Sequence, residues 1–203
     1  MSNFTHLHVH SEYSIFDGIS RIKDLVSTAK NFGMNSIAVT DHGNMYGAID
    51  LYTECIAQGI KPILGSEVYV AINDYKIKDQ SERSPHHMTI LAKNNIGYSN
   101  LVKLLTIANT KGIYYKPRID KDLLLQYKEG LIILSGCPSG EISRLIVNEG
   151  YDKAKEIASW YSDNFPDYYL EIMRHKNVDN LDSINENLIK MSKDTGIPLV
   201  ATN

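Results

Sequence analysis

Short apolar runs rich in β-branched residues alternate along this chain with segments whose apolar residues recur at helical spacing. Such alternation is typical of β/α units built on a mostly parallel sheet. It predicts seven strands: the first begins at residues 7–9, and the others lie at residues 36–40, 63–71, 87–92, 131–135, 168–172 and 198–202. Seven strands alternating with helices favour an α/β barrel or a strongly curved sheet, because periodicity alone does not distinguish a barrel from a doubly wound sheet.

The same pattern predicts helices at residues 22–29, 46–57, 101–108, 141–147, 151–161 and 181–191, with Gly59 ending the second of them. No stretch between the periodic segments resembles a linker rich in Pro, Gly and Ser. With 43% hydrophobic and 22% charged residues, the chain has the composition of an ordinary globular protein. We therefore expect a single domain spanning residues 1–203.

Charge and hydropathy exclude several classes of protein. A net charge of -3 and a pI near 6.2 argue against a protein that holds nucleic acid by general electrostatics, so any nucleic-acid contact must be local. No apolar run approaches the roughly 20 residues that span a bilayer, and we expect a cytoplasmic protein without membrane contact. The two cysteines, Cys55 and Cys137, are too few for a disulfide framework and fit a reducing compartment.

Histidines alternate near the start of the chain, in the predicted first strand. Residues i and i+2 of a strand point to the same face and lie about 6.6 Å apart. His8 and His10 can therefore reach one metal centre, whereas His6 lies farther from the carboxyl end of the strand, where sites in parallel sheets usually open. The alternative is a strand with exposed histidines.

Further polar residues fall near the ends of the predicted strands, where sites in β/α folds are built. Imidazoles, carboxylates and a thiol are the ligand types of zinc and, with more oxygen ligands, of manganese or iron. Together with His8 and His10, the candidate set comprises Asp17, Asp41, His42, Glu67, His87 and Cys137.

The carboxylates also allow structural interpretations. Asp17 precedes Gly18 and suits a turn. Asp41 could cap the next helix or orient a ligand histidine from behind, and we prefer these roles to direct ligation. Glu67 is harder to explain structurally, because an unpaired buried carboxylate is costly.

The remaining candidates leave alternatives open. Strand parity does not decide between His86 and His87, and Cys137 alone suits a small core residue. Arg174, after the sixth strand, lies near the expected rim and could touch phosphate, or it belongs to an ordinary exposed loop. A short basic aromatic patch could stack bases and contact phosphates, or form a solvated surface; it comprises Lys111, Tyr114, Tyr115, Lys116 and Arg118.

Several segments together resemble the polymerase and histidinol phosphatase (PHP) family, in particular its branch within bacterial replicative DNA polymerases. The motifs are His8–Ser14, Asp17-Gly18, Thr40–Met45, Gly59–Val70 and Leu134–Cys137. The linking segments at residues 94–100 and 114–118 carry no metal chemistry but are typical of the polymerase branch. The similarity covers essentially the whole chain.

The resemblance implies a distorted (β/α)7 barrel with up to three divalent metal ions, zinc, manganese or iron, in a cleft at the carboxyl ends of its strands. His87 is preferred to His86 because the family's histidine immediately precedes its hydrophobic strand. The family's ligands map by motif to His8, His10, Asp17, His42, Glu67, His87 and Cys137. An Asp-x-His motif should follow the seventh strand, but the sequence stops at Asn203, so we expect fewer ions and impaired activity.

The resemblance also implies a function, that of a metal-dependent phosphoesterase of the 3′-5′ exonuclease type that proofreads for a replicative polymerase. The expected partners are a DNA 3′ end or another phosphoester substrate, the remaining modules of the polymerase, and a proofreading exonuclease subunit. One alternative is a non-catalytic structural or partner-binding domain. A free-standing phosphomonoesterase of the histidinol phosphatase type is less favoured, because the linking segments are polymerase-like.

Overall fold

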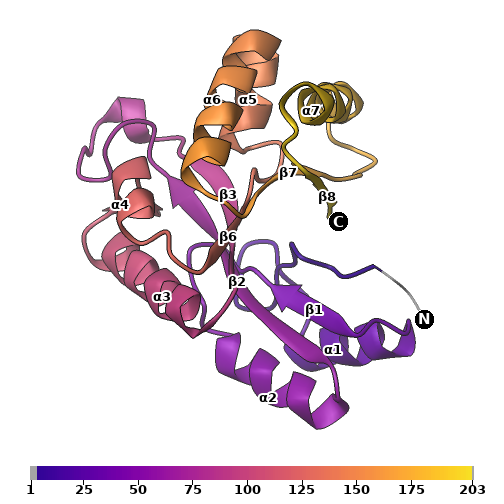
Figure 1. Ribbon diagram of the computed structural model, residues 1–203. Helices are drawn as coiled ribbons and strands as arrows, with labels where there is room; N and C mark the ends of the chain where they lie inside the picture. The colour runs from indigo at the N-terminus through magenta and orange to yellow at the C-terminus, as the bar shows by residue number, and fades with distance from the viewer. Residues whose placement is uncertain (1–3, 203) are drawn as a thin grey trace.

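A curled mixed sheet forms the frame of the molecule, and helices surround it on the outside (Figure 1). The computed structural model describes residues 4–202. Within them the sheet has eight strands in the order β4-β5-β2-β3-β6-β7-β8, with β1 paired to β2. The strands are β1 (Ser36–Val39), β2 (Lys61–Val70), β3 (His86–Ala92), β4 (Ile113–Tyr114), β5 (Lys116–Ile119), β6 (Leu131–Leu134), β7 (Tyr168–Ile172) and β8 (Leu199–Ala201). The predicted curved α/β architecture is confirmed as a half-barrel.

Six helices match the predicted periodic segments, whereas α4, a helix of six residues, was not predicted. The helices are α1 (Ile22–Asn31), α2 (Ala48–Gln58), α3 (Asn95–Thr110), α4 (Lys121–Gln126), α5 (Glu141–Asn148), α6 (Tyr151–Asn164) and α7 (Leu181–Thr195). Helix α2 ends at Gly59, whose φ of 72° is the left-handed conformation expected there. Asn94 caps α3 by accepting a hydrogen bond from Gly97 N. No helix in the described residues has the length and apolar character needed to cross a bilayer.

Strand β3 runs antiparallel to both of its neighbours, β2 and β6, whereas the sequence pattern predicted a mostly parallel sheet. The start of β3 therefore lies beside the end of β2, with Val70 opposite His86. This direction brings the amino end of β3 to the same rim as the carboxyl ends of β2 and β6. His87, the second residue of β3, therefore lies at the rim.

The predicted first strand, at residues 7–9, is not a regular strand. The segment runs along β1, and Ala38 N and Thr40 N donate to His6 O at 2.9 Å and to Val9 O at 2.8 Å. Val9 follows His6 by three residues along the N-terminal segment, whereas Thr40 follows Ala38 by only two residues on the β1 side. One extra residue therefore interrupts the ladder, as in a β-bulge.

A short hairpin, β4–β5, was not predicted from the sequence. Its strands are only two and four residues long and include Pro117, so they carry no readable periodicity. The fully buried Arg118 holds it in place by donating to the carbonyl oxygens of Gly112, Tyr75 and Ile77. Arg118 also pairs with Glu82, which is equally buried, at 3.4 Å.

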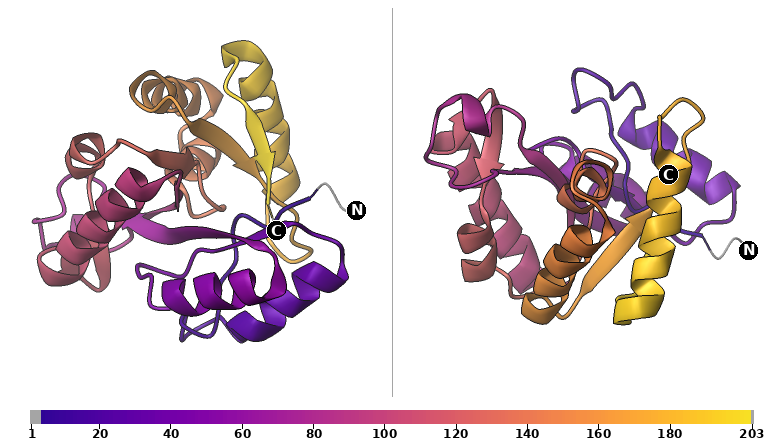
Figure 2. Two further views of the ribbon diagram at one scale, coloured as in Figure 1. Left: turned by 60° about the horizontal axis from the view of Figure 1, so that its bottom comes forward. Right: turned by 90° about the horizontal axis from the view of Figure 1, so that it is seen from above.

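The apolar core has three parts. The largest lies between the sheet and helices α3 to α7, and fully buried members include Ile90, Leu104 and Leu170. Each such side chain contributes about 1.5–3 kcal/mol through burial. A second cluster joins α1 and α2 to β1. A smaller third cluster, built on Ala38, Leu91 and Leu134, joins β1, β3 and β6. Figure 2 shows the curled sheet in two further views.

Strand alternation places polar side chains above this inner apolar layer. Successive residues of a strand face opposite sides, so every second residue of β2 and β3 shares the inner face. In register, Gly65 lies opposite Leu91, Glu67 opposite Thr89, and Tyr69 opposite His87. Towards the rim, the inner face thus changes from apolar to ionisable residues.

Candidate metal centre

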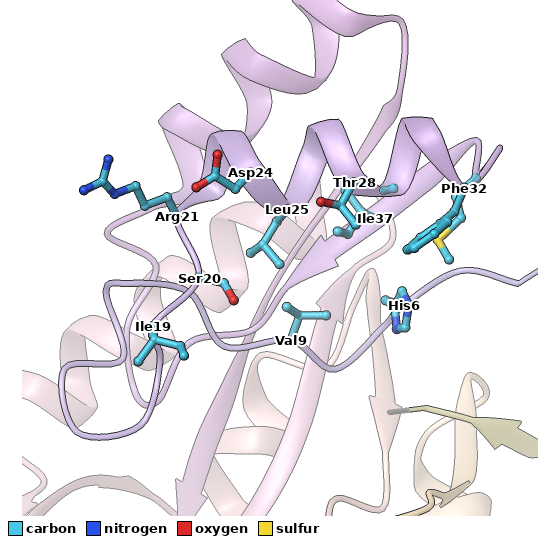
Figure 3. Close-up of a pocket in the computed structure, with 12 residues that line it drawn as sticks. His6, Val9, Ile19, Ser20, Arg21, Asp24, Leu25, Thr28, Phe32 and Ile37 are labelled. Atoms are coloured by element: carbon cyan, nitrogen blue, oxygen red, sulfur yellow. The ribbon is translucent and has the colours of Figure 1, made fainter.

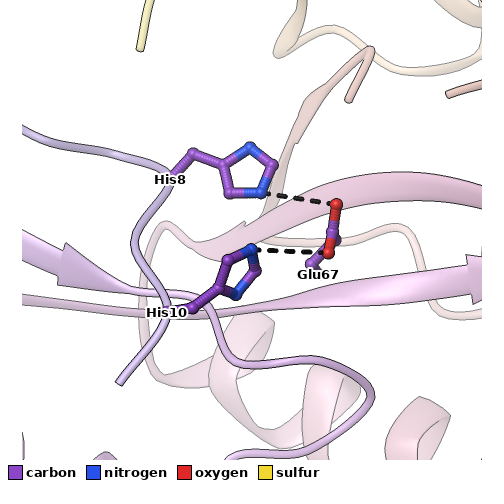
Figure 4. Close-up of side chains that lie close together, drawn as sticks. All are labelled: His8, His10 and Glu67. Carbon is purple, nitrogen blue, oxygen red and sulfur yellow. Dashed lines mark ion pairs between the residues drawn. The ribbon is translucent and has the colours of Figure 1, made fainter. Parts of the chain in front are cut away.

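Glu67, on β2, is the centre of a cluster of imidazoles. Its side chain is 1% exposed. Oε2 lies 2.5 Å from His42 Nδ1, and Oε1 lies 2.9 Å from His87 Nδ1. The N-terminal segment brings His8 Nε2 to 3.4 Å from Oε1 and His10 Nε2 to 3.6 Å from Oε2 (Figure 4). Each carboxylate oxygen therefore faces two imidazoles.

The cluster divides into two groups that share Glu67. One comprises His8, His10 and Glu67, and the other comprises His42, Glu67 and His87; in each, the candidate ligand atoms lie within 4.8 Å of one another. The rings of His10 and His42 stack with centroids 4.0 Å apart, which joins the two groups side by side. Each group offers the ligand types of a divalent cation.

Cys137 joins the cluster from the loop after β6. Its Sγ lies 3.4 Å from Glu67 Oε1 and 3.5 Å from His87 Nδ1. Gly136 permits this approach, because its φ is 87° and a Cβ there would lie 2.5 Å from His87 O. Burial raises the pKa of the Cys137 thiol, so in the absence of metal it stays protonated.

The two aspartates have different places. Asp17 Oδ2 lies 2.9 Å from His42 Nε2, and the Asp17 side chain is 55% exposed at the open side of the cluster. Asp41 is buried and accepts hydrogen bonds from Ser11 N, Ser11 Oγ and Ser14 Oγ, each at 2.7 Å. Within residues 4–202, Asp41 neither touches an imidazole nor caps α2, which begins after Gly47. It fixes the loop that follows His10.

Sequence reasoning missed Glu171, a buried residue on β7. Its Oε1 lies 2.6 Å from His8 Nδ1 and accepts a hydrogen bond from Thr202 Oγ1 at 2.6 Å, while Oε2 accepts one from Gly136 N at 3.1 Å. Because Nδ1 of His8 is engaged there, Nε2 is the atom presented to Glu67. The position of Glu171 among apolar strand residues could have identified it as a candidate, as it did for Glu67.

Electrostatics hold Glu67 and His10 in the states that bind metal, whereas they favour the protonated form of His8, which must lose its proton before it binds an ion. Burial alone would raise the pKa of Glu67, but the adjacent imidazoles of His42, His8 and His87 keep it well below its usual value. Burial would lower the pKa of His8, yet the carboxylates of Glu171 and Glu67 raise it to about 10. Burial lowers the pKa of His10. An ionised carboxylate and a neutral imidazole are the forms that bind metal.

Unpartnered polar atoms show that the residues fit a divalent metal. In the described part of the chain, His10 Nδ1, His42 Nδ1 and Glu67 Oε2 are buried without a hydrogen bond. Unpaired buried polar groups are costly, and native proteins seldom leave them so. His42 Nδ1 and Glu67 Oε2 approach closely without the geometry of a hydrogen bond, as two ligands of one cation would. Imidazole, carboxylate and thiol donors suit zinc, manganese or iron.

Comparison with known proteins places this cluster in a family. The model of the PHP domain matches residues 6–175, which contain every member of the cluster. The chain belongs to the PHP domain family. The family expected from the motifs is thereby confirmed.

Curated relatives of this PHP domain are subunits of a polymerase. DNA polymerase III subunit alpha of Borreliella burgdorferi is 47% identical over 205 residues, and that of Campylobacter jejuni is 45% identical over 214 residues. Each alignment covers 100% of this chain but 18% of the relative. The chain therefore spans about a fifth of the length of these relatives.

A solved structure confirms the fold of the PHP domain. A Bifidobacterium adolescentis protein assigned as a metal-dependent phosphoesterase aligns with a TM-score of 0.61 at 14% identity. The alignment covers 98% of this chain and 86% of that protein. At this identity the likeness concerns the fold alone.

A cleft of about 380 Å³ opens over the His42 and His87 side of the PHP domain's cluster. Asp17 also lines it, and its walls come from the loop after His10 and from the β4–β5 hairpin. Of the predicted basic aromatic patch, Tyr115 and Lys116 line this cleft, but Arg118 is fully buried and unavailable to nucleic acid.

Other residues singled out in the sequence lie away from the cluster. His86 is turned towards the charges of α5, so His87 is the one beside Glu67. Arg174 is exposed in the loop after β7. His6 lines a separate groove of about 510 Å³ between the N-terminal segment and α1 (Figure 3). That groove contains none of the residues that surround Glu67.

Proposed function

We propose that this PHP domain is a metal-dependent phosphoesterase that removes nucleotides from a DNA 3′ end, as the proofreading exonuclease of a replicative polymerase. The observation that carries the proposal is the sharing of Glu67 by four imidazoles beneath an open cleft. The polymerase relatives support DNA as the substrate, the remaining polymerase modules as partners, and the cytoplasm as the location.

The residues nearest Glu67 would serve as the metal ligands. His8, His10, Glu67, His42 and His87 would hold two divalent ions, with Cys137 as a further ligand on the His87 side. When bound, such ions lower the pKa of water and neutralise the charge that develops on a phosphoryl group.

The surrounding side chains would mainly position the ligand residues and are not the primary ligands of the ions. Glu171 orients His8, and Asp41 fixes the loop that carries Asp17. Asp17 reaches His42 from the open side, where it is available both to an ion and to the substrate. A phosphate contact from Arg174, a third ion and a proofreading partner subunit remain predictions.

Assays with two substrates test the function. Purified protein with Mn²⁺ or Zn²⁺ is expected to shorten single-stranded DNA from the 3′ end in preference to hydrolysing histidinol phosphate. Glu67→Gln should abolish the activity because it weakens both ion positions, whereas Glu129→Gln, an exposed carboxylate outside the cluster, should not.

Two results would contradict the proposal. Preference for the monoester would indicate a phosphatase of the histidinol phosphate type. Tight metal binding without turnover of DNA or monoester would indicate a structural domain of the polymerase.

A further inference from the structure

The cleft above the cluster is lined by aromatic and charged side chains. The lining includes the loop that carries Phe16 and Asp17 and the tip of the β4–β5 hairpin, with Tyr115 and Lys116. Its volume, about 380 Å³, lies within the range of small-ligand pockets. One end of the cleft reaches His42 and His87, so a ligand there would lie against the metal centre.

Tyr115 is held in an unusual backbone conformation. It has a φ of 59°, in the left-handed region that favours glycine. The residue is nevertheless 66% exposed, and the guanidinium of Arg83 lies 4.9 Å from the ring centroid. A bulky ring at a strained and exposed position contributes little to the core, and such outliers gather at binding sites.

Phe16 provides a second exposed ring across the cleft. It is 96% exposed. The ammonium group of Lys116 lies 5.7 Å from the Phe16 ring and 5.2 Å from the Tyr69 ring. The cleft therefore combines exposed aromatic rings with a cation placed among them.

This chemistry matches an unpaired nucleotide. Exposed aromatic rings stack on bases of any sequence, and a neighbouring cation contacts the backbone phosphate. A paired base within a duplex is stacked on both faces and must be unstacked before it can use such rings. A net charge of -3 excludes broad electrostatic binding, so a short local site of this kind is the form that nucleic-acid contact can take.

We propose that the cleft binds the unpaired terminal nucleotide of a DNA strand, with its base against Tyr115 and Phe16 and its phosphodiester beside Lys116. The phosphodiester then lies towards His42 and His87. The selection of unpaired over paired ends rests on the proposed function, because it concerns which DNA ends reach the reaction. The proposal that the cleft binds single-stranded DNA does not depend on the proposed function.

Binding and hydrolysis are measured separately on matched variants. The probe is a fluorescein-labelled tetrathymidylate in EDTA, where no metal-dependent hydrolysis occurs, with affinity read by anisotropy. Tyr115→Gly removes the ring and relaxes the backbone, so it should retain the fold. It and Phe16→Ala are each expected to weaken binding about tenfold, the scale of one stacked base.

Three variants serve as controls. Tyr115→Phe keeps the ring and should bind like the wild type. Tyr52→Ala and Phe32→Ala remove aromatic rings that are exposed outside the cleft, and they should leave affinity unchanged. With Mn²⁺, Tyr52→Ala should hydrolyse p-nitrophenyl phosphate as the wild type does, because Tyr52 lies outside both the cleft and the cluster.

The outcomes separate the two proposals. Unchanged tetrathymidylate affinity in both cleft variants, or an equal loss in the two outside controls, overturns the inference even if the protein degrades DNA. A selective loss in the cleft variants supports it even if the wild type hydrolyses no phosphoester, in which case the proposed function alone fails.

Discussion

At the scale of single residues, two buried carboxylates account for the shape of the cluster. The sequence predicted Glu67, because an acid among apolar strand residues needs partners. Glu171 has the same signal between Leu170 and Ile172, yet it was missed because no adjoining motif drew attention to it. Asp41 was predicted to cap a helix or orient a histidine, but it binds the Ser11–Ser14 loop, which no periodicity could indicate.

Glu171 is a positioning residue for His8, and its removal should weaken metal binding. Partners that orient a ligand histidine are typically worth 10–100-fold in affinity. Glu171→Gln is therefore expected to lower Mn²⁺ affinity at least about tenfold in calorimetric titration, with Glu129→Gln unchanged. Thermal unfolding in EDTA verifies that the variant folds. If the folded variant binds Mn²⁺ with wild-type affinity, Glu171 does not position His8 for metal binding.

The raised pKa of His8 predicts how the metal-free protein responds to pH. A folded pKa of about 10 against the ordinary 6.5 means that protonated His8 stabilises the fold fully below pH 6.5. This contribution is lost as pH rises towards 10. The raised pKa of His42 acts in the same direction. Above pH 7.5, His10, whose pKa is lowered, is neutral in both states and has no effect.

Urea unfolding in EDTA between pH 7.5 and 10 checks this prediction. The free energy of unfolding should fall with rising pH, and His8→Gln should flatten the decline. On the acid side, the depressed pKa of Glu67 predicts a loss of stability as pH falls below about 4.5. A free energy that rises across the alkaline range would contradict the proposed charge states.

At the scale of secondary-structure elements, the helices and most strands could be predicted, but the direction of β3 could not. Periodicity reports which face of a strand is buried and carries no information on direction. One signal was available, because parallel neighbours need a crossover that is usually helical, and residues 71–85 show no helical pattern. The β4–β5 hairpin was too short to detect, although its tip forms a wall of the cleft.

The buried Arg118–Glu82 pair should determine whether that hairpin stays in place. Removing one partner of a buried ion pair typically costs about 3–5 kcal/mol, because the other charge is left without compensation. Glu82→Gln is expected to destabilise the protein by about this amount in urea unfolding. The matched control is Asp167→Asn, which breaks the exposed pair with Lys93 and should cost less than about 1 kcal/mol. Equal effects would mean that the buried pair does not fix the hairpin.

At the scale of the whole molecule, the cluster joins parts of the chain that are far apart in sequence. The N-terminal segment, β2, the start of β3 and the loop after β6 all meet at Glu67. The curved α/β fold and this convergence were predicted from strand ends and motifs.

Because these segments come together only in the folded state, metal should stabilise the whole domain. A ligand at about 100 times its Kd adds roughly 2.7 kcal/mol to the free energy of unfolding. Mn²⁺ or Zn²⁺ is expected to raise the Tm of the wild type, and Glu67→Gln should lose most of the increase. An equal rise in both proteins would place the stabilising metal elsewhere.

Anomalous diffraction from crystals grown with Mn²⁺ or Zn²⁺ tests whether the residues around Glu67 hold metal, because it locates the ions themselves. Two anomalous peaks are expected within coordinating distance of Glu67, one beside His8 and His10 and the other beside His42 and His87. Fully loaded crystals with no anomalous peak at Glu67 would contradict this expectation.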